Sequence, residues 1–98
     1  MQEFFENLQN KRILNIDYYS FNEAAASEFY NTLIQYHSTH YLYRTKENMR
    51  YYIRGLVAYD SFDLKYEFYQ LALLAEHCDC IRFSGYGSSP ERTDIAVE

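Results

Sequence analysis

The sequence predicts one small α+β domain with the element order β-α-β-β-α-β. Residues 21–37 and 60–77 both repeat apolar side chains at helical spacing. Strand-like segments lie before, between and after these two helices. In these segments apolar and polar residues alternate, or aromatic and β-branched residues are frequent. The chain has 98 residues, a length that suits a single core, so we expect residues 1–98 to form one domain.

The chain is expected to begin with a short helix and a strand. In a helix over residues 1–11, Phe4, Phe5 and Leu8 would lie on one side. Residues 12–19 predict a half-buried strand, because every second residue is apolar, namely Leu14, Ile16 and Tyr18.

The first long helix is predicted over residues 21–37. Ser20 and Glu23 have the spacing of a capping box, with Ser20 as the N-cap. One side of this helix carries an apolar stripe made of Ala25, Phe29, Leu33 and Tyr36.

Residues 41–59 predict a β-hairpin, with strands at 41–44 and 50–59 and a polar loop at 45–48. The alternative is a helix over 46–59, which would make the protein a mostly α-helical bundle. The strand is favoured because Gly55 would cost a helix about 1 kcal/mol and because Tyr, Ile and Val prefer strands.

The second half of the chain predicts a helix and then a strand. Asp60 or Ser61 can cap a helix over 60–77, whose apolar side consists of Leu64, Phe68, Leu71, Ala72 and Ala75. A short strand is expected at 80–84. The glycines that follow it predict a break, so residues 85–98 are expected to form a turn and a tail, or a weak edge strand.

This order is that of the split-βαβ, or ferredoxin-like, arrangement, in which two helices cover one face of an antiparallel sheet. The other face would be open to solvent or to a partner. Side chains alternate along a strand, so if Ile53 and Val57 face the helices, then Tyr52, Arg54 and Leu56 face away.

The net charge and the composition limit the classes of function that the protein can have. A net charge of −5 argues against non-specific binding to nucleic acid or to an anionic membrane. Residues 39–59 are the exception, with Arg44, Lys46, Arg50 and Arg54 against Glu47 alone. The chain also has 12 Tyr, a residue that buries a ring and keeps a hydroxyl in need of a partner.

The cysteines and the lack of long apolar runs predict a soluble, cytoplasmic protein that does not enter a membrane. Cys78 and Cys80 are one residue apart, so a disulfide between them would close a strained ring. The sequence has neither the pattern of a signal peptide nor an apolar run long enough to cross a bilayer.

No motif in the sequence predicts an enzyme, a cofactor or a metal site. The residues His77, Cys78 and Cys80 form one cluster, whereas a zinc site usually needs two separated pairs, and His37 and His40 are not placed beside it by any pattern. Whether the cluster binds a metal is left open. Neighbouring acids disfavour a thiolate, so a nucleophilic cysteine is not expected.

Residues 54–59 resemble part of an RNA-recognition motif. Arg54 and Gly55 match the start of its third-strand signature, but Leu56 and Ala58 stand where that family has aromatic rings. The resemblance implies that the hairpin binds single-stranded nucleic acid.

We expect a non-catalytic protein that docks on a larger macromolecule, because Tyr and Arg dominate interface hot spots. The predicted partner-binding residues are Tyr41, Tyr43, Arg44, Arg50, Tyr52 and Arg54. The expected partner is a protein, such as a nucleic-acid-handling enzyme. Size and composition are similar to those of small phage or mobile-element accessory proteins, including anti-CRISPR-type inhibitors. Two alternatives remain: a nucleic-acid-binding or regulatory module that uses the hairpin, and an obligate homodimer joined through the Tyr-rich face.

Overall fold

The computed structural model describes residues 12–60, 63–88 and 95–97 of the chain, and side chains up to residue 87. The described elements are β1 (Arg12–Ser20), α2 (Glu23–Tyr36), β2 (Ser38–Glu47), β3 (Arg50–Tyr59), α3 (Leu64–His77), β4 (Arg82–Ser88) and β5 (Ile95–Val97). The helix expected over residues 1–11 lies outside the described residues.

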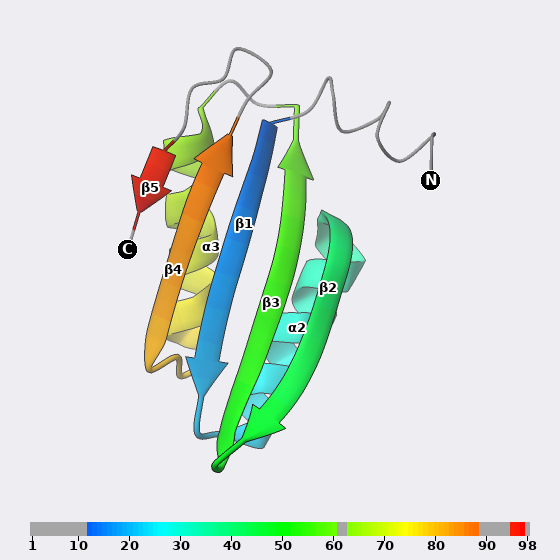
Figure 1. Ribbon diagram of the computed structural model, residues 1–98, viewed down its shortest axis with the longest axis vertical. Helices are drawn as coiled ribbons and strands as arrows, with labels where there is room; N and C mark the ends of the chain where they lie inside the picture. Colours follow the sequence, from blue (N-terminus) through cyan, green and yellow to red (C-terminus); the bar gives the residue numbers. More distant parts are fainter. Residues whose placement is uncertain (1–11, 61–62, 89–94, 98) are drawn as a thin grey trace.

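The described strands form one sheet in the order β2-β3-β1-β4-β5, and every neighbouring pair is antiparallel. Both helices lie on the same side of this sheet, α2 behind β2 and β3 and α3 behind β1 and β4 (Figure 1). The protein is therefore a small α+β domain, and its arrangement is consistent with the predicted ferredoxin-like one. β5 adds a short strand at the outer edge of β4, in the segment for which an edge strand was one of two expectations.

The core lies between the sheet and the helices. Strand β1 alternates as predicted, with Leu14, Ile16 and Tyr18 almost completely buried and Asn15 exposed. The helices bury the apolar stripes that face these residues: Ala26, Phe29 and Leu33 in α2, and Leu64, Phe68, Leu71 and Ala75 in α3. The ring of Tyr18 stacks on that of Phe29 with 4.3 Å between their centroids.

Both helices begin later than the sequence predicted. Asn22, not Ser20, caps α2, and its side chain accepts a hydrogen bond from the backbone N–H of Ala25. The Ser20 hydroxyl donates to the Asp79 carbonyl instead, which ties the end of β1 to the loop after α3. Asp63, not Asp60 or Ser61, caps α3. In each case a residue nearer the apolar stripe supplies the cap.

Residues 50–59 form a strand, so the alternative of a helix over 46–59 is wrong. β3 pairs with β2 on one side and with β1 on the other, so most of its backbone groups are hydrogen-bonded within the sheet. The second strand has the predicted bounds, whereas β2 is longer than predicted, and only Asn48 and Met49 join the two strands. Both have positive φ angles, 51° and 65°, as tight hairpin turns require.

β2 contains a bulge opposite Gly55. The register shifts between His40 and Tyr43, so two residues of β2 lie opposite one residue of β3. Tyr41 has a φ of 56° at this point. The bulge turns Leu42 toward the core, where it packs against the buried cluster.

Gly85 does not end the last long strand, contrary to the prediction, because β4 continues to Ser88. A β-carbon on Gly85 would lie 2.6 Å from Cε1 of Phe68. The glycine thus leaves room for the Phe68 ring of α3 against the sheet. Neither described helix is long and apolar enough to cross a membrane.

Candidate binding surface

The side of the sheet opposite the helices is the candidate binding surface, and we call it the open face. No described helix or strand lies over it (Figure 1). Its residues follow from the strand register and from the alternation of side chains. They are Asn15, Asp17 and Tyr19 of β1, His40, Tyr43, Thr45 and Glu47 of β2, Arg50, Tyr52, Arg54 and Leu56 of β3, and Arg82, Ser84 and Tyr86 of β4.

The structure brings five of the six predicted binding residues to the open face. Tyr43, Arg50, Tyr52 and Arg54 lie on it directly. Tyr41, in the bulge, lines the same hollow of about 350 Å³ as Tyr43 and Arg54, and it is 60% exposed.

The sixth predicted residue, Arg44, lies on the other side of the sheet. Its partner in the register is the buried Ile53, and its guanidinium carbon is 4.6 Å from the centroid of the Tyr30 ring on α2. Sequence analysis treated the basic hairpin as one surface, whereas the structure separates Arg44 from the other five predicted residues. Adjacent residues of a strand point to opposite faces, so Tyr43 and Arg44 cannot share one.

Tyr19 and Tyr52 form an aromatic pair on the open face, near the end of β1. They are direct neighbours on the two adjacent strands β1 and β3, and their ring centroids are 5.4 Å apart. The guanidinium carbon of Arg54 lies 4.6 Å from the Tyr52 centroid, and that of Arg50 lies 5.6 Å from the Tyr19 centroid. Two aromatic rings and two cations are therefore grouped on one solvent-facing area.

Arg54 is held in place by Asp17. Arg54 Nε donates a hydrogen bond to Asp17 Oδ1 at 3.1 Å, and both side chains are nearly half exposed. This hydrogen bond is the largest cause that raises the pKa of Arg54. Asp17 thus fixes the direction of the cation and neutralises part of the charge on the face.

The first and fourth strands contribute residues that sequence analysis missed. Tyr19, Arg82 and Ser84 line a second hollow of about 290 Å³ together with Asp17, Tyr52 and Arg54. The signal was present in β1, where Tyr18 was identified as core and its neighbour Tyr19 must therefore face outward. The neighbouring position of Arg82 could not be predicted, since it depends on the register between β1 and β4.

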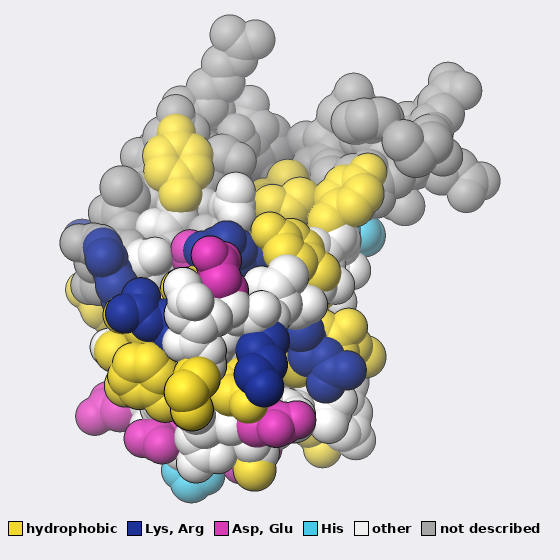
Figure 2. Space-filling view, turned by 60° about the horizontal axis from the view of Figure 1, so that its bottom comes forward, with side chains coloured by type: hydrophobic (Ala, Val, Ile, Leu, Met, Phe, Trp, Pro, Cys, Tyr) yellow, Lys and Arg dark blue, Asp and Glu magenta, His cyan; other side chains and the backbone are white. Residues whose placement is uncertain are grey.

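Charge is separated between the sheet and the helices. The described strands carry six basic side chains against two acidic ones: Arg12, Arg44, Lys46, Arg50, Arg54 and Arg82 against Asp17 and Glu47. The helices carry mostly acidic side chains: Glu23, Glu28, Glu67 and Glu76 against Lys65. Basic and hydrophobic side chains lie next to one another in Figure 2, which turns the end with the β2–β3 turn toward the viewer.

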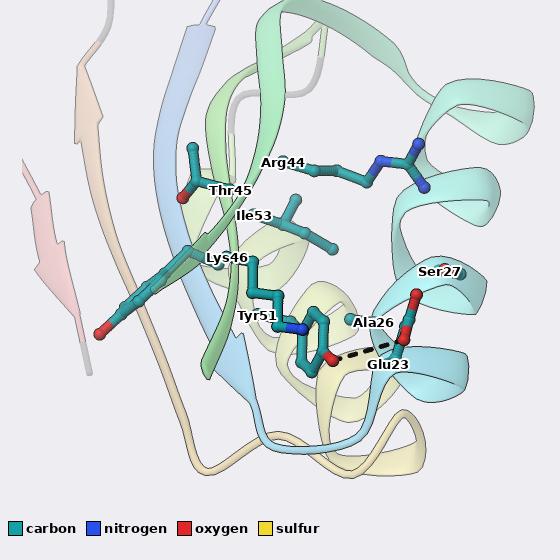
Figure 3. Close-up of a pocket in the computed structure, with 9 residues that line it drawn as sticks. Glu23, Ala26, Ser27, Arg44, Thr45, Lys46, Tyr51 and Ile53 are labelled. Carbon is teal, nitrogen blue, oxygen red and sulfur yellow. Dashed lines mark hydrogen bonds between the residues drawn. The ribbon is translucent and has the colours of Figure 1, made fainter. Parts of the chain in front are cut away.

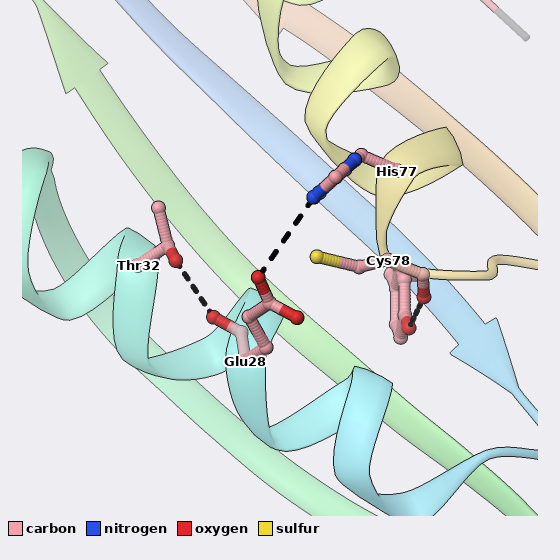
Figure 4. Close-up of polar contacts among 5 residues, drawn as sticks. Glu28, Thr32, His77 and Cys78 are labelled. Atoms are coloured by element: carbon pink, nitrogen blue, oxygen red, sulfur yellow. Dashed lines mark hydrogen bonds and ion pairs between the residues drawn. The ribbon is translucent and has the colours of Figure 1, made fainter.

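The cluster of His77, Cys78 and Cys80 does not form a metal site in the described part of the chain. No three His, Cys, Asp or Glu side chains are grouped there in a way that could hold an ion. His77 instead faces Glu28 of α2, with 4.0 Å between Nε2 and Oε1, and its side chain is 76% exposed (Figure 4). Cys78 is buried, and burial raises the pKa of its thiol to about 11. A thiol with such a pKa is a poor nucleophile at neutral pH.

Comparisons with known proteins identify no relative. No protein-family model matches the chain, and neither a curated protein nor a solved structure matches it significantly.

Proposed function

We propose that the protein acts without catalysis, by docking the open face on a larger protein and thereby inhibiting or regulating it. The grouping of Tyr19, Tyr52, Arg50 and Arg54 on one uncovered side of the sheet carries this proposal. Tyr and Arg are over-represented among the residues that contribute most to protein interfaces.

The rigidity of the face supports the proposal. The residues that carry it, Tyr19, Tyr52, Arg50 and Arg54, belong to β1 and β3, two inner strands of the sheet that are packed on the core. Asp17 and the Tyr52 ring restrain Arg54 before any partner arrives. A preorganised surface loses less conformational entropy on binding than a flexible one, so more of its contact energy appears as affinity.

The charge separation supports a directional approach. On the open face, Arg50, Arg54 and Arg82 outnumber Asp17 and Glu47, whereas the helices carry excess negative charge. A partner with an acidic patch would meet the sheet first, and its encounter with the helices would be disfavoured. In an inhibitor, such as the small phage-type proteins of similar size and composition, this docking would cover a working surface of the target.

The test is a comparison of two matched double variants in an affinity capture from the source cell. Tyr52→Ala/Arg54→Ala removes one ring and one cation from the open face. Tyr66→Ala/Lys65→Ala removes the same groups from the exposed side of α3. We expect the wild type and the α3 variant to retain one stoichiometric protein after nuclease treatment, and the open-face variant to lose it. Equal retention by both variants would refute the assigned surface.

A second candidate function is binding of single-stranded nucleic acid on the same face. One observation favours it: Tyr19 and Tyr52 lie side by side on the two adjacent strands β1 and β3, with a cation close to each ring. Stacking of a base on such a ring contributes about 1–3 kcal/mol. The Tyr18 ring does not take part, because it lies in the core.

Salt and nuclease distinguish the two candidates. Contacts to phosphates release counterions, so binding of nucleic acid weakens steeply as salt rises. If the captured material disappears on nuclease treatment and at higher salt, the second candidate is supported and the first is refuted. A symmetric dimer on sedimentation, with neither ligand captured, would instead identify the open face as a seam between two copies.

A further inference from the structure

Strand β2 has one edge that no described strand covers. β2 is the outermost strand of the sheet, and only its inner edge is paired, with β3. Beyond the bulge, the pairing is regular from Tyr43 to Glu47. The outer backbone groups of this segment can therefore pair with one more strand.

Two cations lie beside this edge on the helix side of the sheet. Arg44 and Lys46 are two residues apart, so both point toward α2, and Figure 3 shows their side chains in the space between β2 and α2. A hollow of about 270 Å³ is lined by both of them, and by Tyr51, Glu23 and other residues. This hollow lies next to the outer edge of β2.

The two cations are available for an anion. Arg44 lies against the Tyr30 ring, and Lys46 Nζ is 5.4 Å from the Tyr51 centroid. Within the described residues, neither forms an ion pair with a carboxylate. The nearby Glu23 accepts a hydrogen bond from the Tyr51 hydroxyl at 3.3 Å instead.

Charge disfavours a second copy of this chain as the added strand when the two-fold axis lies at Arg44, Thr45 or Lys46. A symmetric antiparallel pair places residues of the same face opposite one another. With Thr45 on the two-fold axis, Arg44 would lie opposite Lys46 of the copy. With the axis at Arg44 or at Lys46, that residue would lie opposite itself. Each register juxtaposes like charges, which destabilises a sheet.

The charges of an acidic strand would instead be complementary to those of Arg44 and Lys46. If every second residue is acidic, its carboxylates lie on one face, at the spacing of Arg44 and Lys46. Main-chain hydrogen bonds along Tyr43–Glu47 would supply affinity, and the two cations would select the sequence. We propose that β2 takes up an extended acidic segment of a partner protein as a further strand, with a carboxylate in the hollow beside Arg44 and Lys46.

This site does not depend on the open face, because its side chains point to the opposite side of the sheet. The probe for the test is a capped peptide of about eight residues in which Glu alternates with Val and Thr, which is the period that strand addition requires. Backbone amide shifts of the labelled protein are followed by NMR as this peptide is added to millimolar concentration. We expect shifts in residues 43–47 and little change in β4.

Two peptide controls separate strand addition from simple charge attraction. A peptide with Gln in place of Glu tests the need for carboxylates. A peptide methylated on alternate backbone nitrogens keeps the charge but cannot complete the ladder. We expect both to bind at least about tenfold more weakly than the probe, since each removes one of the two contributions.

A matched pair of charge reversals tests the location. Lys46→Glu, in the β2 site, and Lys65→Glu, on the exposed side of α3, change the net charge equally, but only the first changes the β2 site. We expect the first to weaken the probe at least about tenfold and the second to leave its affinity nearly unchanged. Absence of shifts in β2, equal binding of the methylated peptide, or equal effects of the two variants would each overturn the proposal.

Discussion

The Cα atom of Leu42 lies 2.6 Å from the position that a β-carbon on Gly55 would occupy. The bulge in β2 therefore sits directly against the backbone of β3, and only glycine leaves room for it. The contact positions both strands of the hairpin. It also places Tyr41 and Tyr43 on the open face and Leu42 in the core.

Gly55→Ala is expected to destabilise the protein by about 1–3 kcal/mol, because the new methyl group overlaps backbone that cannot move without breaking the bulge. Urea unfolding followed by circular dichroism measures the loss. Asn15→Ala, at an exposed position of β1, is the control and should change the free energy of unfolding by less than about 0.5 kcal/mol. If the glycine variant is as stable as this control, β2 does not approach Gly55 so closely.

The buried hydroxyl of Tyr18 joins the sheet to the end of α3. It donates a hydrogen bond to the Cys78 carbonyl at 2.6 Å, and burial raises the pKa of Tyr18 to about 12. Tyr18→Phe keeps the ring and removes this bond, so we expect a loss of about 1–2 kcal/mol in the free energy of unfolding. Tyr66→Phe, at an exposed position, provides the comparison. Similar stability of both variants would mean that the hydroxyl contributes nothing.

The two thiols should differ in reactivity. Cys78 is 1% exposed with a pKa of about 11, whereas Cys80 is partly exposed and its pKa is raised, first by burial and then by Glu76. In a Cys80→Ser variant, the remaining Cys78 should react with a thiol reagent far more slowly when folded than when unfolded in urea. In a Cys78→Ser variant, Cys80 should react faster than Cys78 does. Fast labelling of folded Cys78 would contradict its burial.

His37 should make the protein less stable in acid. Burial beside Tyr59 lowers the pKa of His37, and the charge of Glu67 opposes this only in part. The unfolded chain then binds a proton at a higher pH, near the ordinary value of about 6.5, than the folded protein does. Stability therefore rises with pH up to about that value and is lost as the pH falls below it.

The measurement is the free energy of unfolding in urea from about pH 5 to pH 8, the range in which a histidine titrates. His37→Gln should flatten the decline on the acid side. An unchanged decline in His37→Gln would show that other groups cause it.

The sequence alone was sufficient for the elements whose pattern is local. Alternation in β1 correctly predicted that Leu14, Ile16 and Tyr18 face the core. The same alternation in β3 correctly predicted that Tyr52 and Arg54 point away from the helices. The apolar stripe of α3 was equally readable, and so was that of α2 except for Tyr36, which was predicted on the stripe but is 71% exposed. In each case, burial on one side of a strand or helix selects apolar residues at the fixed period of that element. The resulting pattern can be recognised in the sequence.

Only the tertiary structure decided what depends on contacts between distant residues. The predicted break at Gly85 is part of a strand because residues 85–88 pair with β1, and the glycine leaves space for Phe68 of α3. Ser20 lost its predicted role as a cap because its hydroxyl bonds to Asp79. Tyr19 meets Tyr52 only through the pairing of β1 with β3. A register between strands is the sum of many such contacts, and no local period records it.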